Sequence, residues 1–462
     1  MADVTIDATG QATSYLRGTG TSGPVFTTSL IGYFVFIDAN NDLVYRKTTN
    51  GGSSWDNAVA IKTGSVTDFA IWFDRWTPGG NGTVIHIAYV DVPDTASLIT
   101  YYRSLTTSND SLGTETEIQD STATGTAIGT AVHATGAADE AVVSITKAQG
   151  GQLYVAMRAH VEDAGGDTEV EIFERSTDAG ATWEARTSPF ESAAGDTILL
   201  VPGDTSDTND IGGIYMDASG NAVSVKMYDD SANTWTETAV GGFAEQNNQR
   251  NIAASVRHSD QHVIMVVVNG AAAAGTDLNC WDLTLDTIAT PTVTGKTDVY
   301  TNLDQAQQCA VFVSQRNNAE HIYVSYIQGT TWGSATHVWY KKSEDGGTTW
   351  GNAVQVDESA ESDNFMVYSS VMTTGNVGRF YVCWFDNNDD DLMGSFVNSI
   401  AFTQGGGGGG GGGQGGGGGN GNGGGNGNGN GGGNGPPGQL RRTIIGQDKQ
   451  RHNNLIHIPG QG

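Results

Sequence analysis

The hydrophobic pattern of this chain is a short apolar segment that recurs at intervals of roughly 50 to 70 residues. A polar turn rich in Asp, Asn and Gly follows each segment. After that turn comes a segment in which apolar and polar residues alternate, as they do in strands with one buried face. A further apolar strand precedes most of these units, and an outer strand closes several of them. Seven copies of the apolar segment can be read, at residues 33–37, 84–89, 153–157, 214–216, 263–267, 322–326 and 380–384.

Four short strands per unit, repeated many times, are typical of a β-propeller. The pattern therefore predicts an all-β fold over residues 1–404, a seven-bladed β-propeller of four-stranded blades. A six-bladed propeller is the alternative, because the innermost strand of the fourth unit is weakly marked. No amphipathic helix of useful length can be read. With strands A to D counted from the axis outward, the B–C and D–A loops share one face, and the A–B and C–D loops share the other.

A turn motif recurs after the alternating strand of several units. It has the form Ser/Thr-x-Asp/Asn-x-Gly-x-Ser/Thr-Trp at residues 48–55, 176–183 and 343–350, with a degenerate copy at 229–235. The acidic or amide side chain accepts hydrogen bonds from backbone N–H groups, glycine supplies a positive φ, and tryptophan packs beneath the strands. The residues that define the motif are Asn50, Gly52, Trp55, Asp178, Gly180, Trp183, Asp345, Gly347 and Trp350.

These turns resemble the Asp-box, or BNR, repeats of sialidase-type β-propellers. The resemblance implies the same fold, with the boxes in C–D turns on one rim. It also implies a binding site on the opposite face, where the B–C and D–A loops lie. The boxes themselves are not specific for the activity of that family, since they stand away from its active site.

The sialidase mechanism needs three arginines that hold the substrate carboxylate, a tyrosine nucleophile assisted by a glutamate, and an aspartate acid. That family usually places its first arginine in Arg-Ile-Pro before the first box, whereas here Arg17 is followed by Gly-Thr. Other residues of the required types stand outside recognisable family motifs; they are Arg250, Arg257, Arg316, Tyr368, Glu245 and Asp74. We therefore predict that the chain is not an enzyme and has no catalytic residues, with a sialidase-like glycoside hydrolase as the alternative.

Two other candidate sites lie in B–C turns. Trp332, in a Thr-Thr-Trp-Gly turn outside any box, is a candidate platform for stacking on a sugar ring. The alternative is a turn residue packed against its neighbour. Asp386, Asp389 and Asp391 supply the oxygen density that Ca²⁺ prefers, but they lack the full spacing of a calcium loop. The main interpretation is a solvated turn, so no cofactor is predicted and Ca²⁺ is the alternative.

The chain is strongly acidic, with a formal net charge of -29. Residues after Gly438 hold four Lys/Arg against one Asp, a net of +3, so the rest of the chain carries -32. Such a surface repels nucleic acid and anionic membranes. The first residues lack the features of a secretion signal, and no apolar run approaches the roughly 20 residues of a membrane span. We predict no nucleic-acid partner, no membrane insertion and synthesis in a cytoplasm. The three cysteines show no metal spacing and are predicted to be buried thiols.

The strand pattern stops near Thr403. Residues 405–439 form a Gly/Asn-rich linker that cannot bury a core, and a flexible tether and an ordered glycine helix both fit this composition. Residues 440–462 are basic and contain two apolar triplets. We predict a docking peptide that adds a strand to a partner's sheet, with an inert chain end as the alternative. The residues of this predicted anchor are Arg441, Arg442, Ile444, Ile445, Leu455, Ile456 and Ile458.

A propeller joined to an anchor by a polyglycine stalk resembles a bacteriophage virion component. The resemblance implies a non-catalytic protein of the virion surface, such as a decoration protein, fibre or adhesin. Many copies, with a homo-oligomer as one arrangement, attach to other virion proteins through residues 440–462, and the propeller recognises a host-surface glycan. A purely structural scaffold propeller is the second alternative.

Overall fold

The structure is a computed structural model in which fifteen segments are described. All of them lie in one compact unit, Met1–Gln404. The predicted linker at 405–439 and the predicted docking peptide at 440–462 lie outside the described residues, and both stay predictions. The described segments are 3–8, 23–94, 97–120, 142–161, 168–191, 196–217, 222–242, 252–269, 276–303, 308–314, 321–329, 336–357, 364–369, 379–386 and 391–399.

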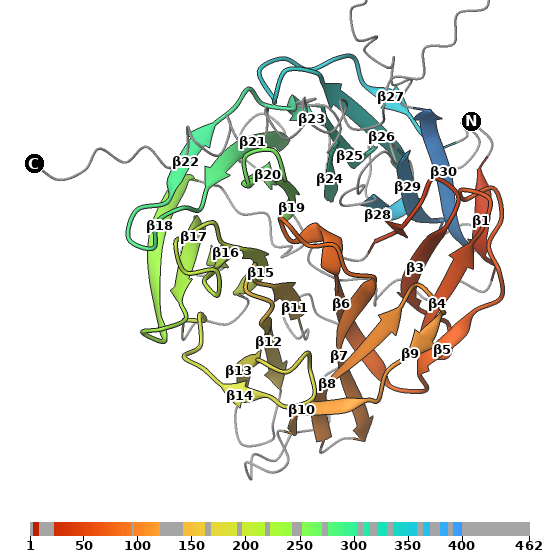
Figure 1. Ribbon diagram of the computed structural model, residues 1–462. Coiled ribbons are helices and arrows are strands. Elements are labelled where there is room, and N and C mark those ends of the chain that lie inside the picture. Colours follow the sequence, from red (N-terminus) through yellow and green to blue (C-terminus); the bar gives the residue numbers. More distant parts are fainter. Residues whose placement is uncertain are drawn as a thin grey trace, which may run out of the picture. The chain divides into compact units, whose positions relative to one another are not determined.

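The strands form seven antiparallel sheets arranged as blades around a central axis (Figure 1). Within a blade, consecutive strands run from the axis outward. Blade 1 contains β2 (Val25–Phe26), β3 (Gly32–Ile37), β4 (Leu43–Thr48) and β5 (Val59–Lys62). Blade 2 contains β6 (Val66–Phe73), β7 (Val84–Asp94), β8 (Ser97–Thr106) and β10 (Thr116–Asp120), with the short β9 (Ser111–Leu112) also paired to β8. Blade 3 contains β11 (Val142–Lys147), β12 (Leu153–Val161), β13 (Thr168–Ser176) and β14 (Glu184–Ala185).

The remaining blades repeat this order. Blade 4 contains β15 (Thr197–Pro202), β16 (Ile211–Asp217), β17 (Ala222–Asp229) and β18 (Thr234–Gly242). Blade 5 contains β19 (Ile252–Arg257), β20 (His262–Asn269), β21 (Thr276–Thr284) and β22 (Thr292–Gly295), and β23 (Tyr300–Leu303) also pairs with β21. Blade 6 contains β24 (Cys309–Val313), β25 (Ile322–Gly329), β26 (Thr336–Ser343) and β27 (Val354–Gln355). Blade 7 contains β28 (Asn364–Ser369), β29 (Arg379–Asp386), β30 (Asp391–Ser399) and β1 (Val4–Asp7).

The ring is closed by a strand from the other end of the propeller sequence. β1 pairs antiparallel with β30, with Val4 opposite Gly394, and so becomes the outermost strand of blade 7. Asp7, at the end of β1, forms an ion pair of 2.6 Å with Arg46 in blade 1. The first described strand therefore joins the last blade to the first.

The seven-bladed, all-β prediction is confirmed, and the six-bladed alternative is wrong. The weakly marked innermost strand of blade 4 is β15, all of whose residues are buried. In the described part of the chain, the helical structure is a single short 3₁₀ turn, η1 (Asp74–Trp76). No helix in those segments is long and apolar enough to cross a bilayer.

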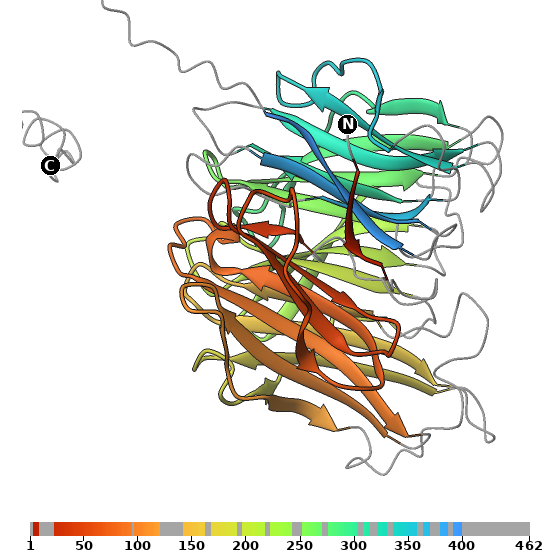
Figure 2. The same ribbon diagram turned by 90° about the vertical axis from the view of Figure 1, so that its right-hand side faces the viewer.

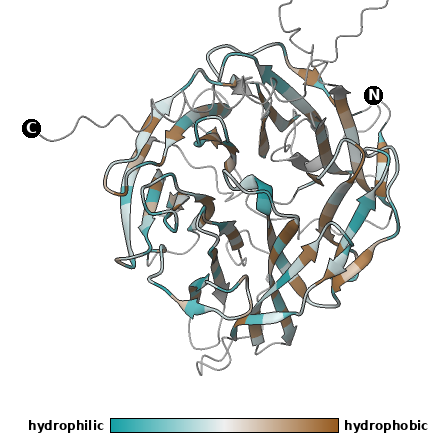
Figure 3. Cartoon of the chain, in the orientation of Figure 1, coloured by the Kyte–Doolittle hydropathy of each residue, from teal (hydrophilic) through white to brown (hydrophobic). Residues whose placement is uncertain are grey.

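The hydrophobic core lies between adjacent blades. Every residue of β6 is buried, because the inner strands are covered on both sides by neighbouring sheets. Figure 3 shows the resulting apolar colouring of the inner and middle strands. Figure 2 shows from the side that the strands of each blade run between the two faces of the ring. Cys280, Cys309 and Cys383 are buried thiols, as predicted.

Candidate functional site

The propeller has two faces with different loops. The A–B face carries the A–B loops, such as residues 74–83, and the C–D turns, such as residues 49–58. The B–C face carries the B–C turns, such as residues 38–42, and the D–A loops, such as residues 63–65. Each candidate residue can therefore be assigned to a face from its position at a strand end.

The three copies of the turn motif fold alike on the A–B face. In the second copy, the Ser176 hydroxyl donates to Asp178 and accepts the N–H of Gly180 at 2.8 Å. The Asp178 carboxylate accepts the backbone N–H of Thr182 at 2.8 Å and its hydroxyl at 2.6 Å. These hydrogen bonds, led by that of the Thr182 hydroxyl, lower the pKa of Asp178 to about 2. Equivalent contacts are made in the turns at 48–55 and 343–350.

Each of these turns also contacts the preceding blade through its tryptophan. The contacts differ in kind and reach different parts of the preceding blade, but each joins two successive blades, so they give the motif a structural role. They are Trp55 Nε1 to the Tyr381 hydroxyl at 3.3 Å, the Trp183 ring to the Tyr102 ring at 5.4 Å between centroids, and Trp350 Nε1 to the Thr297 carbonyl at 3.0 Å.

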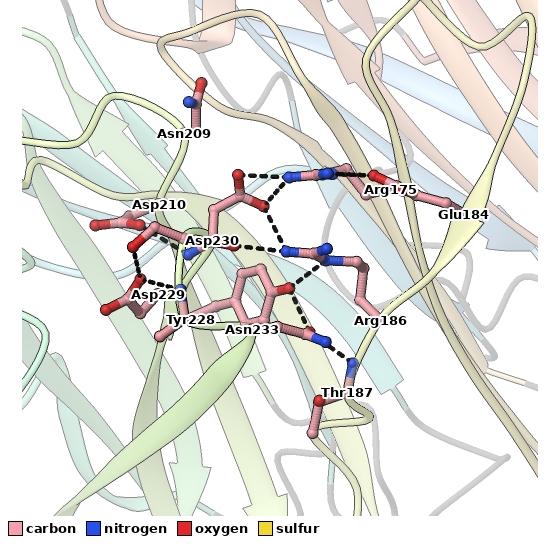
Figure 4. A network of polar contacts seen from close by, with 12 residues as sticks. Arg175, Glu184, Arg186, Thr187, Asn209, Asp210, Tyr228, Asp229, Asp230 and Asn233 are labelled. Carbon is pink, nitrogen blue, oxygen red and sulfur yellow. Dashed lines mark hydrogen bonds and ion pairs between the residues drawn. The ribbon is translucent and has the colours of Figure 1, made fainter.

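An ion-pair network joins blades 3 and 4 on the A–B face (Figure 4). Arg175, near the end of β13, donates to both carboxylate oxygens of Asp230 at 2.6 Å and also pairs with Glu184. Arg186 lies 3.4 Å from the Asp230 carboxylate and donates to the Tyr228 hydroxyl at 2.7 Å. Asp230 is buried, so two arginines neutralise a carboxylate that would be costly to bury alone. The network holds the two blades together.

The A–B loops of several blades meet over the central axis. Figure 1 shows the turn after β6, which contains η1, in the middle of the ring. A ring nitrogen of His258, in blade 5, lies 3.3 Å from the carbonyl oxygen of Trp76, in blade 2. The Thr77 hydroxyl donates to the carbonyl of Lys147, in blade 3, at 2.7 Å. Blades 2 and 5 are not neighbours, so the loop crosses the centre of the A–B face, where Trp76 is completely buried.

A buried cluster of hydrogen-bonded polar side chains supports this loop. Asp74 lies 3.0 Å from one ring nitrogen of His86, and the other ring nitrogen lies 2.7 Å from the Tyr102 hydroxyl. Lys147 also pairs with Asp74. Burial opposes ionisation of Asp74, but the contacts with His86 and Lys147 hold its pKa well below the usual range. Burial lowers the pKa of His86. Asp, His and Tyr in line are residue types found in catalytic sites, yet these side chains are buried between blades.

The B–C face has a cluster of a different composition at the junction of blades 3 and 4. Arg158, in β12, lies 3.1 Å from the carboxylate of Asp196 and 3.9 Å from that of Glu171. The Tyr215 hydroxyl donates to Asp196. Burial, together with this hydrogen bond, raises the pKa of Tyr215. Tyrosine, carboxylate and arginine are the types a sialidase uses, but Tyr215 is completely buried and Arg158 is 3% exposed.

Lys226 completes this cluster from β17. Its ammonium lies 3.5 Å from the centroid of the Tyr215 ring, donates to the carbonyl of Pro189 at 2.7 Å, and pairs with Glu191 at 3.1 Å. The backbone N–H of Glu191 donates to the Tyr215 hydroxyl at 3.0 Å. In the described part of the segment that leads from blade 3 to blade 4, Pro189 and Glu191 thus contact blade 4.

Every arginine whose side chain is described is engaged by another protein group. Four pair with carboxylates, one contacts a carboxylate and a tyrosine hydroxyl, and two donate to backbone carbonyls. The pairs are Arg46 with Asp7, Arg158 with Asp196, Arg175 with Asp230, Arg257 with Asp260 and Asp282, Arg186 with Asp230 and Tyr228, Arg75 with Gly82, and Arg103 with Gly113 and Ile61.

The structure does not bring the sequence candidates for sialidase chemistry together. Arg257 and Asp74 both lie on the A–B face, each in its own ion-pair cluster, instead of on the B–C face. Of Tyr368, the backbone alone is described. Arg17, Glu245, Arg250 and Arg316 lie outside the described residues. The cluster around Arg158 was missed because its members are scattered through the sequence; the weak signals were a charged residue and a tyrosine within otherwise apolar strands.

The remaining candidates are only partly covered by the described residues. Asp386 is buried at the end of β29 and stands opposite Asp391 at the start of β30, whereas Asp389 lies outside. In the segments that are described, no three His, Cys, Asp or Glu residues are placed to hold a metal ion. Trp332 and all of the anchor residues, Arg441, Arg442, Ile444, Ile445, Leu455, Ile456 and Ile458, also lie outside, so these interpretations stay predictions.

Comparison with solved structures finds similarities to distant proteins. An ulvan lyase of polysaccharide lyase family PL25, bound to -[GlcA(1-4)Rha3S]-, has a TM-score of 0.52 at 11% identity, over 85% of this chain and 95% of that chain. A protein of unknown function from Dyadobacter fermentans has a TM-score of 0.44 at 12% identity, over 74% and 96%. An α-L-arabinofuranosidase from Fusarium graminearum has a TM-score of 0.37 at 12% identity, over 53% and 77%. No protein-family model and no curated protein matches the sequence. The likeness to the lyase shows the propeller fold.

Proposed function

We propose that this chain is a non-catalytic, carbohydrate-recognising protein of a virion surface. Its propeller presents the B–C face to a glycan of the host surface, and residues 440–462 attach it to other virion proteins. The proposal joins a described propeller to a glycine-rich linker and a basic, partly apolar terminal peptide, both known from the sequence.

The observation that carries the proposal is that every described arginine side chain already contacts another group of the protein. A sialidase holds its substrate carboxylate with free arginines. Arg158, by contrast, is buried beside Asp196, and Arg175 is buried in part beside Asp230. Taking an arginine from a buried carboxylate leaves that charge unpaired, at a cost of about 3–5 kcal/mol. Recognition of a neutral glycan needs hydrogen bonds to its hydroxyl groups and an aromatic ring on which a sugar can stack. It does not require an arginine to leave its carboxylate partner.

The B–C face is the more suitable binding surface. On the A–B face, η1 (Asp74–Trp76) crosses the centre and the repeated turns are committed to contacts between blades. β25 ends and β26 begins at the B–C face, and the sequence between them contains Trp332, our candidate sugar platform. A propeller of this architecture acts on a polysaccharide in the ulvan lyase, whose likeness at 11% identity bears on the fold alone. Display in many copies adds weak individual contacts together by avidity.

The test is a glycan-array screen of the full chain displayed on beads. Sialoside hydrolysis and polysaccharide depolymerisation are read in the same wells. We expect binding without turnover, and we expect Trp332→Ala to lower binding about fivefold or more, because stacking of a sugar ring on an aromatic ring is worth about 1 kcal/mol. Thr331→Ala, in the same turn, is the matched control and should bind as the wild type does. Turnover would overturn the non-catalytic assignment. If neither glycan binding nor turnover is detected, the result would favour a structural scaffold.

A glycoside hydrolase is the second candidate, favoured by the contact of Tyr215 with Asp196 beside Arg158. If turnover is found, Tyr215→Phe separates a catalytic tyrosine from a structural one. Loss of turnover with unchanged glycan binding and unchanged thermal stability would assign the chemistry to Tyr215. Equal turnover in the variant would place the chemistry elsewhere.

A further inference from the structure

His337 is a partly exposed histidine at the B–C face of blade 6, held by a buried carboxylate. It is the second residue of β26, and its side chain is 26% exposed. Its Nδ1 lies 2.9 Å from Oδ2 of Asp357, whose side chain is completely buried. The backbone N–H of Val338 donates to the other oxygen of Asp357 at 3.2 Å. Both oxygens of this carboxylate are therefore in use within blade 6.

The Asp357 carboxylate determines which nitrogen of His337 carries the proton. A carboxylate can only accept hydrogen bonds, so Nδ1 donates to it and Nε2 presents a lone pair. The amide nitrogen of Gln355 lies 3.3 Å from Nδ1, but it also has an acceptor in the carbonyl oxygen of Asp357 at 3.4 Å. Among the described residues, all hydrogen bonds of the ring are made at Nδ1, and the exposed side of the ring carries Nε2. A carboxylate behind a histidine orients many histidines that bind ligands.

Two neighbours of His337 project from the same face of the blade 6 sheet. Gln328, in β25, is its direct cross-strand partner and is partly exposed. Trp339, two residues along β26, is also partly exposed and packs against the core between blades 5 and 6, which lie side by side (Figure 1). Within the described part of the chain, the Gln328 side chain makes no hydrogen bond. An imidazole acceptor, a carboxamide and an indole therefore lie together at the B–C end of this junction.

This composition favours an uncharged sugar as the ligand. All three groups are neutral, and they supply hydrogen bonds and an apolar ring surface, as sugar-binding sites do. Asp357 is committed to His337 and Val338 and is buried, so it is not offered to a cation. In the segments that are described, no three His, Cys, Asp or Glu residues are placed to hold a metal ion. The sequence between β25 and β26 also contains Trp332, our candidate sugar platform.

We propose that His337 contacts the sugar in the glycan site and that Asp357 is its positioning residue. Nε2 of His337 accepts a hydrogen bond from a hydroxyl group of an uncharged sugar. The Gln328 amide binds a second hydroxyl group, and Trp339 provides an apolar surface beside the sugar ring. This inference rests on the proposed function and narrows it, because it places the site at the junction of blades 5 and 6 and excludes sugars that are recognised through a carboxylate or sulfate.

The first test compares variants of the full chain on an array of uncharged and acidic glycans. His337→Phe keeps a flat ring without its nitrogens and should lower binding of an uncharged glycan about fivefold, as expected for one lost hydrogen bond. His321→Phe, in the same blade at the A–B face, is the matched control and should bind as the wild type does. Binding that survives His337→Phe would overturn this inference and leave the proposed function standing. Binding confined to acidic glycans would overturn the assignment of an uncharged sugar, and no binding by the wild type would overturn the proposed function as well.

Chemical labelling of the unsubstituted chain tests the site without any change to the fold. Diethyl pyrocarbonate acylates an unprotonated imidazole nitrogen, and mass spectrometry of peptides measures the rate at each histidine. A saturating concentration of the uncharged glycan bound on the array should slow the acylation of His337 about fivefold or more and leave that of His321 unchanged. Equal rates at His337 with and without this glycan would place the sugar elsewhere and overturn the inference.

Asp357→Asn tests the positioning role. The asparagine keeps an acceptor for the Val338 N–H but donates its own N–H to Nδ1 of His337, so the proton moves to Nε2 and the lone pair there is lost. We expect glycan binding to fall about threefold and acylation of His337 to become slower. Faster acylation would mean that the substitution only loosens the packing of the ring, and would overturn the positioning role. Thermal unfolding of each variant confirms that the fold is kept.

Discussion

Glu174 is a buried carboxylate in β13 that makes stability depend on pH. Its side chain lies between blades at 4% exposure, and burial together with the charge of Glu184 raises its pKa from 4.5 to about 7. The folded protein therefore keeps this proton between pH 4.5 and about 7, where the unfolded chain has lost it. The stabilisation is fully present below the unfolded value and is lost as the pH rises through the folded value.

We expect Glu174→Gln to stabilise the protein at about pH 8 by about 1–3 kcal/mol and to change little at about pH 4, since glutamine resembles the protonated acid. Urea unfolding of both proteins at several pH values measures the difference. Glu184→Gln is the control, because it removes the neighbouring charge but leaves Glu174 buried. The pKa of Glu174 in the folded protein should fall but stay above its unfolded value, so stability should still depend on pH, over a narrower range. A difference that stays constant from pH 4 to pH 8 would show that Glu174 does not titrate in this range.

At the scale of single residues, the sequence indicated turn residues better than buried charges. The hydrogen bonds of Asp178 are local, to Ser176 and Thr182, and a motif of eight residues contains all the partners. Arg158 and Asp196 are far apart in sequence and come together only because blades 3 and 4 are adjacent. No spacing rule predicts such a pair, so the principal polar cluster of the described B–C face could not be read in advance.

The repeated turns are elements in which glycine meets two separate demands. Gly180 has φ +90°, and a Cβ built there would overlap the ring of Tyr102 in the preceding blade. Gly347 has φ +86°, but the nearest atom to its added Cβ is Lys296 Cβ, at an ordinary contact distance of 3.4 Å. The first glycine is therefore required by backbone conformation and by packing, and the second by conformation alone.

We expect Gly347→Ala to destabilise the protein by about 1–2 kcal/mol, the cost of a left-handed conformation for alanine. Gly180→Ala should cost about 3 kcal/mol or more, because the added methyl group also displaces the Tyr102 ring. Chemical unfolding of both variants measures the two changes. The comparison is decisive because the turns are otherwise alike; equal losses would mean that the ring moves aside freely and that the turn does not fix the neighbouring blade.

At the scale of strands, the local apolar pattern was sufficient to predict most strands. It failed where the partner strand is far away in the sequence or where the apolar run is interrupted. β6, β12 and β20 were read from runs of apolar residues, which is what strands covered on both faces show. β15 was underestimated because it ends in proline, followed by glycine, although its six residues are all buried. β1 was missed because its partner, β30, lies near the other end of the propeller sequence. Periodicity shows that a segment is a strand, but it does not show which distant strand completes its sheet.

At the scale of the whole molecule, the ring is held closed by β1. Ile6 is 1% exposed in the core between blades, whereas Thr5 beside it is exposed to solvent. Ile6→Asn places a polar amide in that core and should cost about 3–5 kcal/mol, while Thr5→Asn should stay within about 0.5 kcal/mol. If the propeller unfolds as one cooperative unit, the loss extends far from the substitution, because blades that are not closed into a ring expose their inter-blade surfaces.

Amide hydrogen exchange measures this extension. Blade 4, on the far side of the ring, should lose protection in Ile6→Asn by the same free energy as blade 7, and Thr5→Asn should leave both unchanged. Loss confined to β1, β29 and β30 would contradict a single cooperative unit and would show that blade 7 opens by itself. In that case the first and last strands form a local seam, and the stability of the other six blades comes from their contacts with one another.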